Sequence, residues 1–145
     1  MPERWSHLPD HAYVPGRTAR HPDGWFDVLR ATARADMSAA QLIESDAWLA
    51  GIAYFDGAFF WEAHEVWEAV WLALPEGADR RFVQAAIQLA NAGLKARMQR
   101  PNAVARLLQI VSALSEDLPD SCEDRFGFPL QAHWQRLHEE LIRSR

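Results

Sequence analysis

His64 and Glu68 are the two residues whose types and spacing are best suited to chemistry. A histidine and a glutamate four positions apart on a helix lie one turn apart on the same face, so the carboxylate can hydrogen-bond the imidazole and favour its protonated form. An imidazole held in this way can exchange protons near neutral pH. We therefore predict His64 and Glu68 as the acid–base pair of a catalytic site, with Glu65 as the next candidate.

Polar side chains on a second segment could meet this pair. Gln84, Gln88 and Asn91 repeat at four- and three-residue steps, which places their amides on one stripe of a helix. Amides donate and accept hydrogen bonds, so these side chains could contact the acid–base pair or a ligand. We predict Gln84, Gln88 and Trp61 as ligand-binding residues. The alternative is a purely structural cluster whose groups satisfy one another and fix the helix register.

The sequence predicts no metal site and no cofactor. A di-iron helical bundle needs Glu-x-x-His on two helices, and neither this tetrapeptide nor His-Glu-x-x-His occurs. A mononuclear site would have to combine His64 and Glu68 with His133 or His138, which are five positions apart and point to different sides of a helix. The serines lack the elbow motif of a nucleophilic hydrolase.

The elements that would position these residues are all expected to be helices. Apolar residues recur at three- and four-residue steps, and no segment alternates as a strand does. The predicted fold class is therefore all-α, a compact single-domain antiparallel helical bundle with an extended N-terminal arm. The expected helices cover residues 25–33, 38–43, 47–55, 58–74, 80–99, 102–117 and 129–141, and residues 118–127 are expected to form a loop.

The segment 58–74 is expected to be the central helix, because it carries three tryptophans and aromatic side chains bury large areas. At 3.6 residues per turn, Phe60, Trp67 and Trp71 share the inward arc, and Glu62 falls almost opposite it. Small residues in segment 80–99 would let that helix pack closely against the tryptophans.

Residues 1–23 are predicted to form an extended arm packed on the domain, which comprises residues 24–145. Prolines at four positions exclude a continuous helix in this arm. Its apolar side chains indicate that it lies along a surface groove; they are Trp5, Leu8, Tyr13 and Val14.

The composition limits the kinds of partner. A net charge of −5 gives no positive field for phosphate backbones, so we expect no nucleic acid. A single cysteine, Cys122, indicates a reducing compartment, and no apolar run has the length of a signal peptide or membrane span. We therefore expect a cytoplasmic protein with no membrane partner. Seven tryptophans favour an exposed apolar patch and hence a homodimer.

Residues 48–118 resemble the DUF309 family of small uncharacterised proteins. The resemblance rests on residues 54–57, on Phe60-Trp61-Glu62-Ala63-His64-Glu65-Val66-Trp67-Glu68, on residues 82–84 and on residues 87–90. Residues 13–22 also resemble an N-terminal extension of some members. The resemblance implies an all-helical fold and no known reaction. Two positions depart from the family pattern, since Ala85 replaces a usual glycine and Leu94-Lys95 stands where a histidine is often found.

These observations give two hypotheses about function. The first is a helical domain whose Glu/His/Gln cluster binds a small molecule or performs acid–base chemistry through His64 and Glu68. The second is a non-catalytic protein-interaction module in which the cluster is structural, and Trp61 or the arm contacts a partner.

Overall fold

The structure is a computed structural model that describes residues 8–144. These residues form helices and no strands, so the predicted all-α fold is confirmed. The helices are α1 (Asp27–Arg30), α2 (Ala39–Ile43), α3 (Asp46–Asp56), α4 (Phe60–Ala73), α5 (Ala78–Arg97), α6 (Pro101–Ser115), α7 (Ser121–Phe126) and α8 (Leu130–Arg143).

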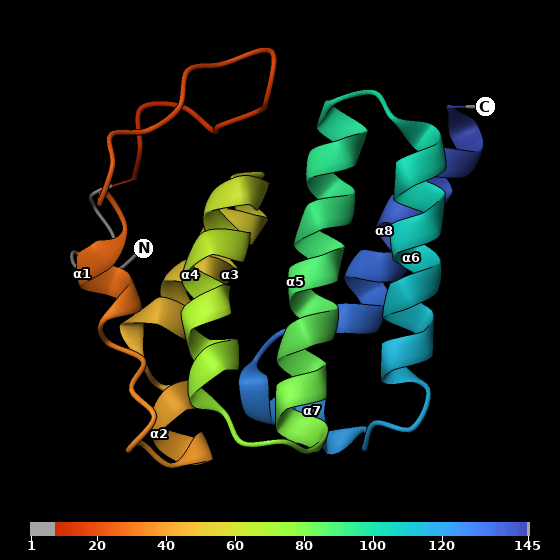
Figure 1. Cartoon of the computed structure of the whole chain (residues 1–145). Helices are drawn as coiled ribbons and strands as arrows, with labels where there is room; N and C mark the ends of the chain where they lie inside the picture. The colour runs from red at the N-terminus through yellow and green to blue at the C-terminus, as the bar shows by residue number, and fades with distance from the viewer. Residues whose placement is uncertain (1–7, 145) are drawn as a thin grey trace.

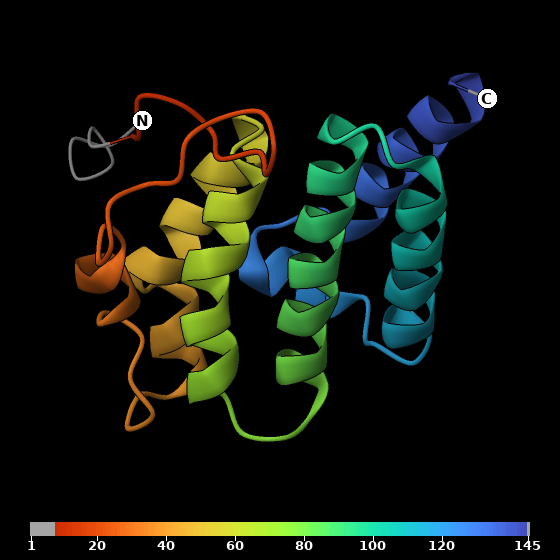
Figure 2. The same cartoon turned by 45° about the horizontal axis from the view of Figure 1, so that its top comes forward.

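The long helices form an antiparallel bundle. α3, α4, α5 and α6 alternate in direction, and α5 lies between α4 and α6 (Figure 1). α8 packs behind α5 and α6, and α1 lies on the opposite edge, against α3 and α4 (Figure 2). The connections between successive long helices are short, which places neighbours in sequence next to each other in space.

α2 and α3 begin where side chains satisfy free backbone donors. Ser38 accepts from the backbone N–H of Gln41, and the Gln41 side chain accepts from the backbone N–H of Ser38, which together form a capping box at the start of α2. Ser45 caps α3 by accepting from Trp48. α6 begins one residue earlier than expected, because Pro101 occupies its first turn, where a missing N–H costs nothing.

The core is built around two stacked tryptophans from adjacent helices. Trp48 of α3 and Trp67 of α4 are fully buried, with ring centroids 4.9 Å apart. The Trp67 indole donates to the Trp48 carbonyl oxygen over 3.1 Å, so its one polar atom is paired inside the core. The ring also lies directly over Gly51, whose missing side chain leaves the space it needs. Gly93 of α5 accommodates Phe60 in the same way.

The expectation of a loop at residues 118–127 is wrong, because part of this segment forms α7. Cys122 and Phe126 are four positions apart and both buried, so one turn of helix places them on the core together. Phe126 stacks on Phe82, and its carbonyl oxygen accepts from the Trp48 indole. Tertiary contacts thus outweigh the loop-like composition of the segment, and the helix ends at Gly127 in the left-handed conformation.

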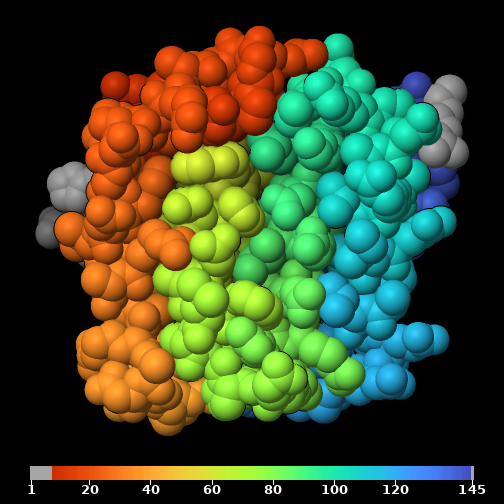
Figure 3. Space-filling view, viewed as in Figure 1, coloured from red at the N-terminus to blue at the C-terminus, as the bar shows by residue number. Residues whose placement is uncertain are grey.

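Residues 8–22 form neither helix nor strand and cross the end of the bundle at which α4 begins (Figure 1). In the space-filling view this segment covers the upper edge of the face beside α4 (Figure 3). We call residues 8–22 the arm from here on. Trp5, which was expected to belong to the arm, lies outside the described residues.

His133 of α8 is a buried histidine in the core. Its side chain is 10% exposed, and its ring lies against the rings of Phe128 and Phe55 at 4.9 and 4.7 Å. Burial lowers the pKa of His133, the neighbouring charge of Arg136 lowers it further, and Asp56 acts in the opposite direction. The imidazole is therefore neutral in the folded protein near neutral pH.

This lowered pKa predicts an acid-dependent loss of stability. In the unfolded chain His133 binds a proton as the pH falls below about 6.5, the ordinary pKa of a histidine. In the folded state the lowered pKa of His133 resists this protonation. The free energy of unfolding should therefore decrease as the pH falls from about 7 to 5. Urea denaturation across this range should show a smaller decrease for His133→Phe than for the wild type. His138→Gln, on the same helix, is the control, and an equal pH dependence in wild type and His133→Phe would contradict the assignment.

Candidate functional site

Glu62 lies in the first turn of α4 and is completely buried, with 0% of its side chain exposed. Its Oε2 atom accepts from the backbone N–H of Tyr13 over 2.7 Å and lies 2.6 Å from Nε2 of His21. Because a carboxylate only accepts hydrogen bonds, Nε2 is the His21 nitrogen that carries the proton. Glu62 was expected to lie opposite the core on an exposed face, and this expectation is wrong because the arm covers that face.

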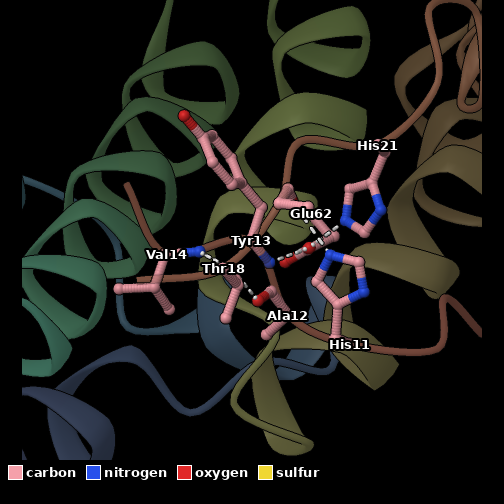
Figure 4. Close-up of polar contacts among 8 residues, drawn as sticks. His11, Ala12, Tyr13, Val14, Thr18, His21 and Glu62 are labelled. Atoms are coloured by element: carbon pink, nitrogen blue, oxygen red, sulfur yellow. Dashed lines mark hydrogen bonds and ion pairs between the residues drawn. The ribbon is translucent and has the colours of Figure 1, made fainter. Parts of the chain in front are cut away.

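The arm reaches Glu62 from two sides because it folds back on itself (Figure 4). The Thr18 hydroxyl donates to the Ala12 carbonyl oxygen and accepts from the Val14 backbone N–H, which closes a turn. His11 contacts the Ala19 carbonyl oxygen over 2.7 Å. These hydrogen bonds hold the segments before and after the turn side by side. Tyr13 and His21 therefore both reach the same carboxylate oxygen of Glu62.

A cavity of about 280 Å³ opens between the arm, the turn before α1, and α4. Aromatic side chains form much of its lining, and charged side chains line it as well. The lining residues are Tyr13, Arg20, His21, Pro22, Asp23, Gly24, Trp25, Phe26, Asp27, Trp61 and Glu65. We call this space the arm cavity. It is slightly smaller than the pockets that hold drug-sized ligands, so it fits a small molecule.

Two residues of the arm cavity are also the partners that hold Glu62. Tyr13 and His21 line the cavity and bind Oε2 of Glu62, so the buried carboxylate lies directly behind the cavity wall. The other carboxylate oxygen, Oε1, is buried and has no hydrogen-bond partner among the described residues. Buried acceptors are normally paired, so Oε1 keeps an unused capacity to accept a hydrogen bond.

Tyr54 of α3 lies close enough to Glu62 for the two to interact. Burial raises the pKa of Tyr54 to about 12, and the nearby charge of Glu62 contributes to the rise. The Tyr54 phenol therefore stays protonated at neutral pH, where it can act only as a hydrogen-bond donor or a neutral acceptor.

His64 and Glu68 lie farther along α4, outside the lining of the arm cavity. His64 Nε2 is 3.8 Å from Glu68 Oε2, which is an ion-pair distance and too long for the expected direct hydrogen bond. His64 Nδ1 is buried and has no hydrogen-bond partner among the described residues. The helix therefore places His64 and Glu68 next to each other, but no hydrogen bond from Glu68 fixes the orientation of the His64 ring.

Arg30 of α1 binds the carboxylates next to His64. Its guanidinium lies 3.7 Å from Oε1 of Glu65 and 3.4 Å from Oε1 of Glu68, and it donates to the backbone carbonyl oxygen of Glu65. No local sequence pattern marks Arg30 as a site residue, because its partners lie more than 30 positions away on another helix. Its guanidinium offsets the negative charge of the two glutamates and ties α1 to α4.

Gln84 and Gln88 of α5 are half-buried. Gln88 accepts from the side-chain amide of Asn91 over 3.1 Å, so the polar stripe is bonded within its own helix. Within residues 8–144, no hydrogen bond or ion pair joins either glutamine to His64, Glu65 or Glu68. The structure instead brings two other candidates, Trp61 and Glu65, to the lining of the arm cavity.

Residues 48–107, which span α3, α4, α5 and the first half of α6, match the model of DUF309, a domain of unknown function. These residues are a DUF309 domain. The resemblance identified from the sequence is therefore confirmed. Searches of curated proteins and of solved structures found no match.

The arm cavity joins the DUF309 domain to a part of the chain outside the matched residues. Trp61 and Glu65 belong to the domain, whereas the arm and the turn before α1 precede it. Glu62 is the domain residue that fixes this junction. Two features of the sequence could have identified Glu62. One is an acidic side chain on the side of the central helix that faces away from the core, and the other is an N-terminal arm whose apolar side chains must pack on some surface.

Neither a metal centre nor a membrane-spanning helix is found among the described residues. Among residues 8–144, no group of three or more histidine, cysteine, aspartate or glutamate side chains is arranged to hold a metal ion. No helix in the same range is both long and apolar enough to cross a bilayer.

Proposed function

We propose that this DUF309 domain binds a small molecule in the arm cavity, with Trp61 and Glu65 contacting the ligand. The observation that carries the proposal is the cavity itself, whose lining is more polar than apolar and combines aromatic with charged side chains; two of its lining residues, Tyr13 and His21, are held by the buried Glu62. A lining of this kind suits a small polar or charged molecule that can make hydrogen bonds and ring contacts. The proposal keeps two of the residues that the sequence favoured and adds the arm as the second wall.

His64 and Glu68 would supply acid–base chemistry to this site only from its edge. The His64 ring lies 6.4 Å from the Trp61 ring, and Glu68 is held by Arg30. Proton transfer is the reaction type that these two side chains support. Binding in the arm cavity does not depend on them, so we treat catalysis as a separate proposal from binding.

The binding proposal can be tested with a fragment library and two-dimensional NMR. Fragments that bind should shift the indole N–H of Trp61 and the backbone N–H of Tyr13, because both residues line the arm cavity. Trp61→Ala should weaken binding about tenfold or more, since a buried aromatic contact is typically worth at least ~1.4 kcal/mol. Glu65→Gln should weaken the binding of fragments that carry a hydrogen-bond donor.

Gln88→Ala is the matched control for this experiment. Gln88 lies on α5 and does not line the arm cavity, so its replacement should leave fragment affinity unchanged. Fragments that shift Gln84 and Gln88 while leaving Trp61 and Tyr13 unaffected would move the site to the α4–α5 face and contradict the proposal.

One observation favours a second function, that of a protein-interaction module. Trp25, just before α1, is 47% exposed, and Val28, on α1, is 81% exposed. Leu8 of the arm is 37% exposed. Exposed apolar side chains of this size are common at interaction surfaces. Replacing Leu8 and Val28 together with serine, neither of which lines the arm cavity, would leave fragment binding by Trp61 intact but abolish self-association or partner binding if the second function holds.

A further inference from the structure

We propose that the ligand of the arm cavity is a small organic cation, an ammonium or quaternary ammonium group carried by a small molecule. This inference rests on the proposed binding function and adds the chemical class of the ligand. The observations behind it are the aromatic lining of the cavity, the balance of its charged side chains and the buried carboxylate behind its wall.

The aromatic rings of the cavity lie close together around Trp61. The Tyr13 and Trp61 rings meet edge to face at 5.3 Å, and Phe26 lies 5.9 Å from Trp61. His21 lies 6.1 Å from Trp61 and 6.3 Å from Trp25. The faces of aromatic rings carry negative charge density, so rings gathered around one small space attract a cation.

The charged side chains of the cavity add to this attraction. Three carboxylates line it, from Asp23, Asp27 and Glu65, against one guanidinium, from Arg20. Arg30 binds Glu65 from outside the cavity, whereas no described residue forms an ion pair with Asp23 or Asp27. The two aspartates therefore keep their negative charge available to a ligand.

Glu62 contributes a further negative group behind the wall. Its side chain is fully buried, and burial weakens the screening of a charge by water. Its Oε2 atom is bound by Tyr13 and His21, and its Oε1 atom has no partner among the described residues. An anionic ligand would face the two aspartates, and the Arg20 guanidinium would have to offset them.

Choline, its neutral isostere 3,3-dimethylbutan-1-ol and acetate form a matched set of probes. At constant ionic strength, choline should shift the Trp61 indole N–H and bind about tenfold more tightly than the alcohol, because the two differ essentially in charge. Equal affinity for choline and the alcohol would overturn the proposal, because the cavity would then recognise shape alone.

Charge variants give an independent test. Asp23→Asn/Asp27→Asn should lower choline affinity about three- to tenfold and leave affinity for the alcohol unchanged, whereas Arg20→Gln should raise choline affinity about twofold. All three side chains are exposed, so the melting temperature should not change. Weaker choline binding by Arg20→Gln would contradict the inference, because removal of a positive charge from the lining should favour a bound cation.

The outcomes separate a wrong ligand class from a wrong site. If acetate or neutral fragments shift Trp61 and Tyr13 while choline does not, the arm cavity is a binding site and only the cationic class fails. If no probe and no fragment shifts these residues, both the cation and the binding function are refuted.

Discussion

Replacing Glu62 with alanine is expected to release the arm from α4. The substitution removes the acceptor shared by the Tyr13 backbone N–H and the His21 imidazole, and it leaves both donors without a partner. Hydrogen bonds to a charged acceptor contribute about 1.5–3 kcal/mol each, so the loss of both should lower the free energy of arm opening by about 3–6 kcal/mol. Glu62→Gln should have a smaller effect, because the amide oxygen can still accept from Tyr13.

Limited trypsin digestion measures this opening directly. Arg17 and Arg20 are exposed residues of the arm, and cleavage after them requires the arm to leave the surface of α4. Cleavage in Glu62→Ala should be at least about 30-fold faster than in the wild type, which corresponds to ~2 kcal/mol. Glu68→Ala is the control, because Glu68 is on the same helix, is 43% exposed and does not contact the arm. Equal cleavage rates in Glu62→Ala and the wild type would disprove the anchoring role.

Trp67→Ala is expected to destabilise the whole domain by about 3–5 kcal/mol. The side chain is completely buried against Trp48, Phe55 and Phe128, so its removal leaves a large cavity between α3 and α4. A loss of this size is a substantial part of the stability of an ordinary domain. Urea denaturation followed by circular dichroism should show it as a lower midpoint with little change in slope.

Gly51 provides a specific check on this packing. A Cβ atom added at Gly51 would lie 2.0 Å from Nε1 of the Trp67 ring, so Gly51→Ala should strongly destabilise the wild type. In the Trp67→Ala background the same methyl group would enter the new cavity, and its cost should largely disappear. Trp25→Ala is the control for loss of an indole at an exposed position. A wild-type midpoint for Trp67→Ala would refute the assignment of this residue to the core.

The junction between the arm and the DUF309 domain links stability to the proposed function. The Tyr13 backbone N–H and the His21 imidazole bind Glu62, and both residues also line the arm cavity. Release of the arm in Glu62→Ala should therefore remove a wall of the cavity as well as expose the arm to protease. Loss of fragment binding in this variant, with α4 still folded, would connect the two experiments.

Much of the fold could be predicted from particular residues. Ser38 with a glutamine three residues later, and Ser45 at the start of an apolar repeat, are local sequence signals of helix caps, and the structure places helix starts at both. Trp67 was assigned to the core because its spacing from Phe60 is close to two helical turns, and it is completely buried. These features depend on residues close together in the chain, which is why sequence patterns identify them.

The errors have a common origin in contacts between distant residues. α7 forms because Phe126 packs on Phe82 and accepts from Trp48, which lie more than 40 positions away in the sequence. Glu62 was placed on an exposed face because a helical wheel considers one helix and its core side only. The burial of His133 has the same origin, because the packing of α8 directs this side chain onto Phe55 and Phe128.

The sequence alone determined the helical class, most of the helix positions, the aromatic core and the membership of residues 48–107 in the DUF309 family, because local spacing governs each of these. Only the tertiary structure decided where a site could form. Among the described residues it forms no hydrogen bond between Gln84 or Gln88 and the titratable groups of α4, and it folds residues 8–22 back over Glu62, whose two partners lie 41 and 49 positions away. A cavity made by segments so far apart in the chain depends on how they pack, and no periodic pattern in either segment specifies that packing.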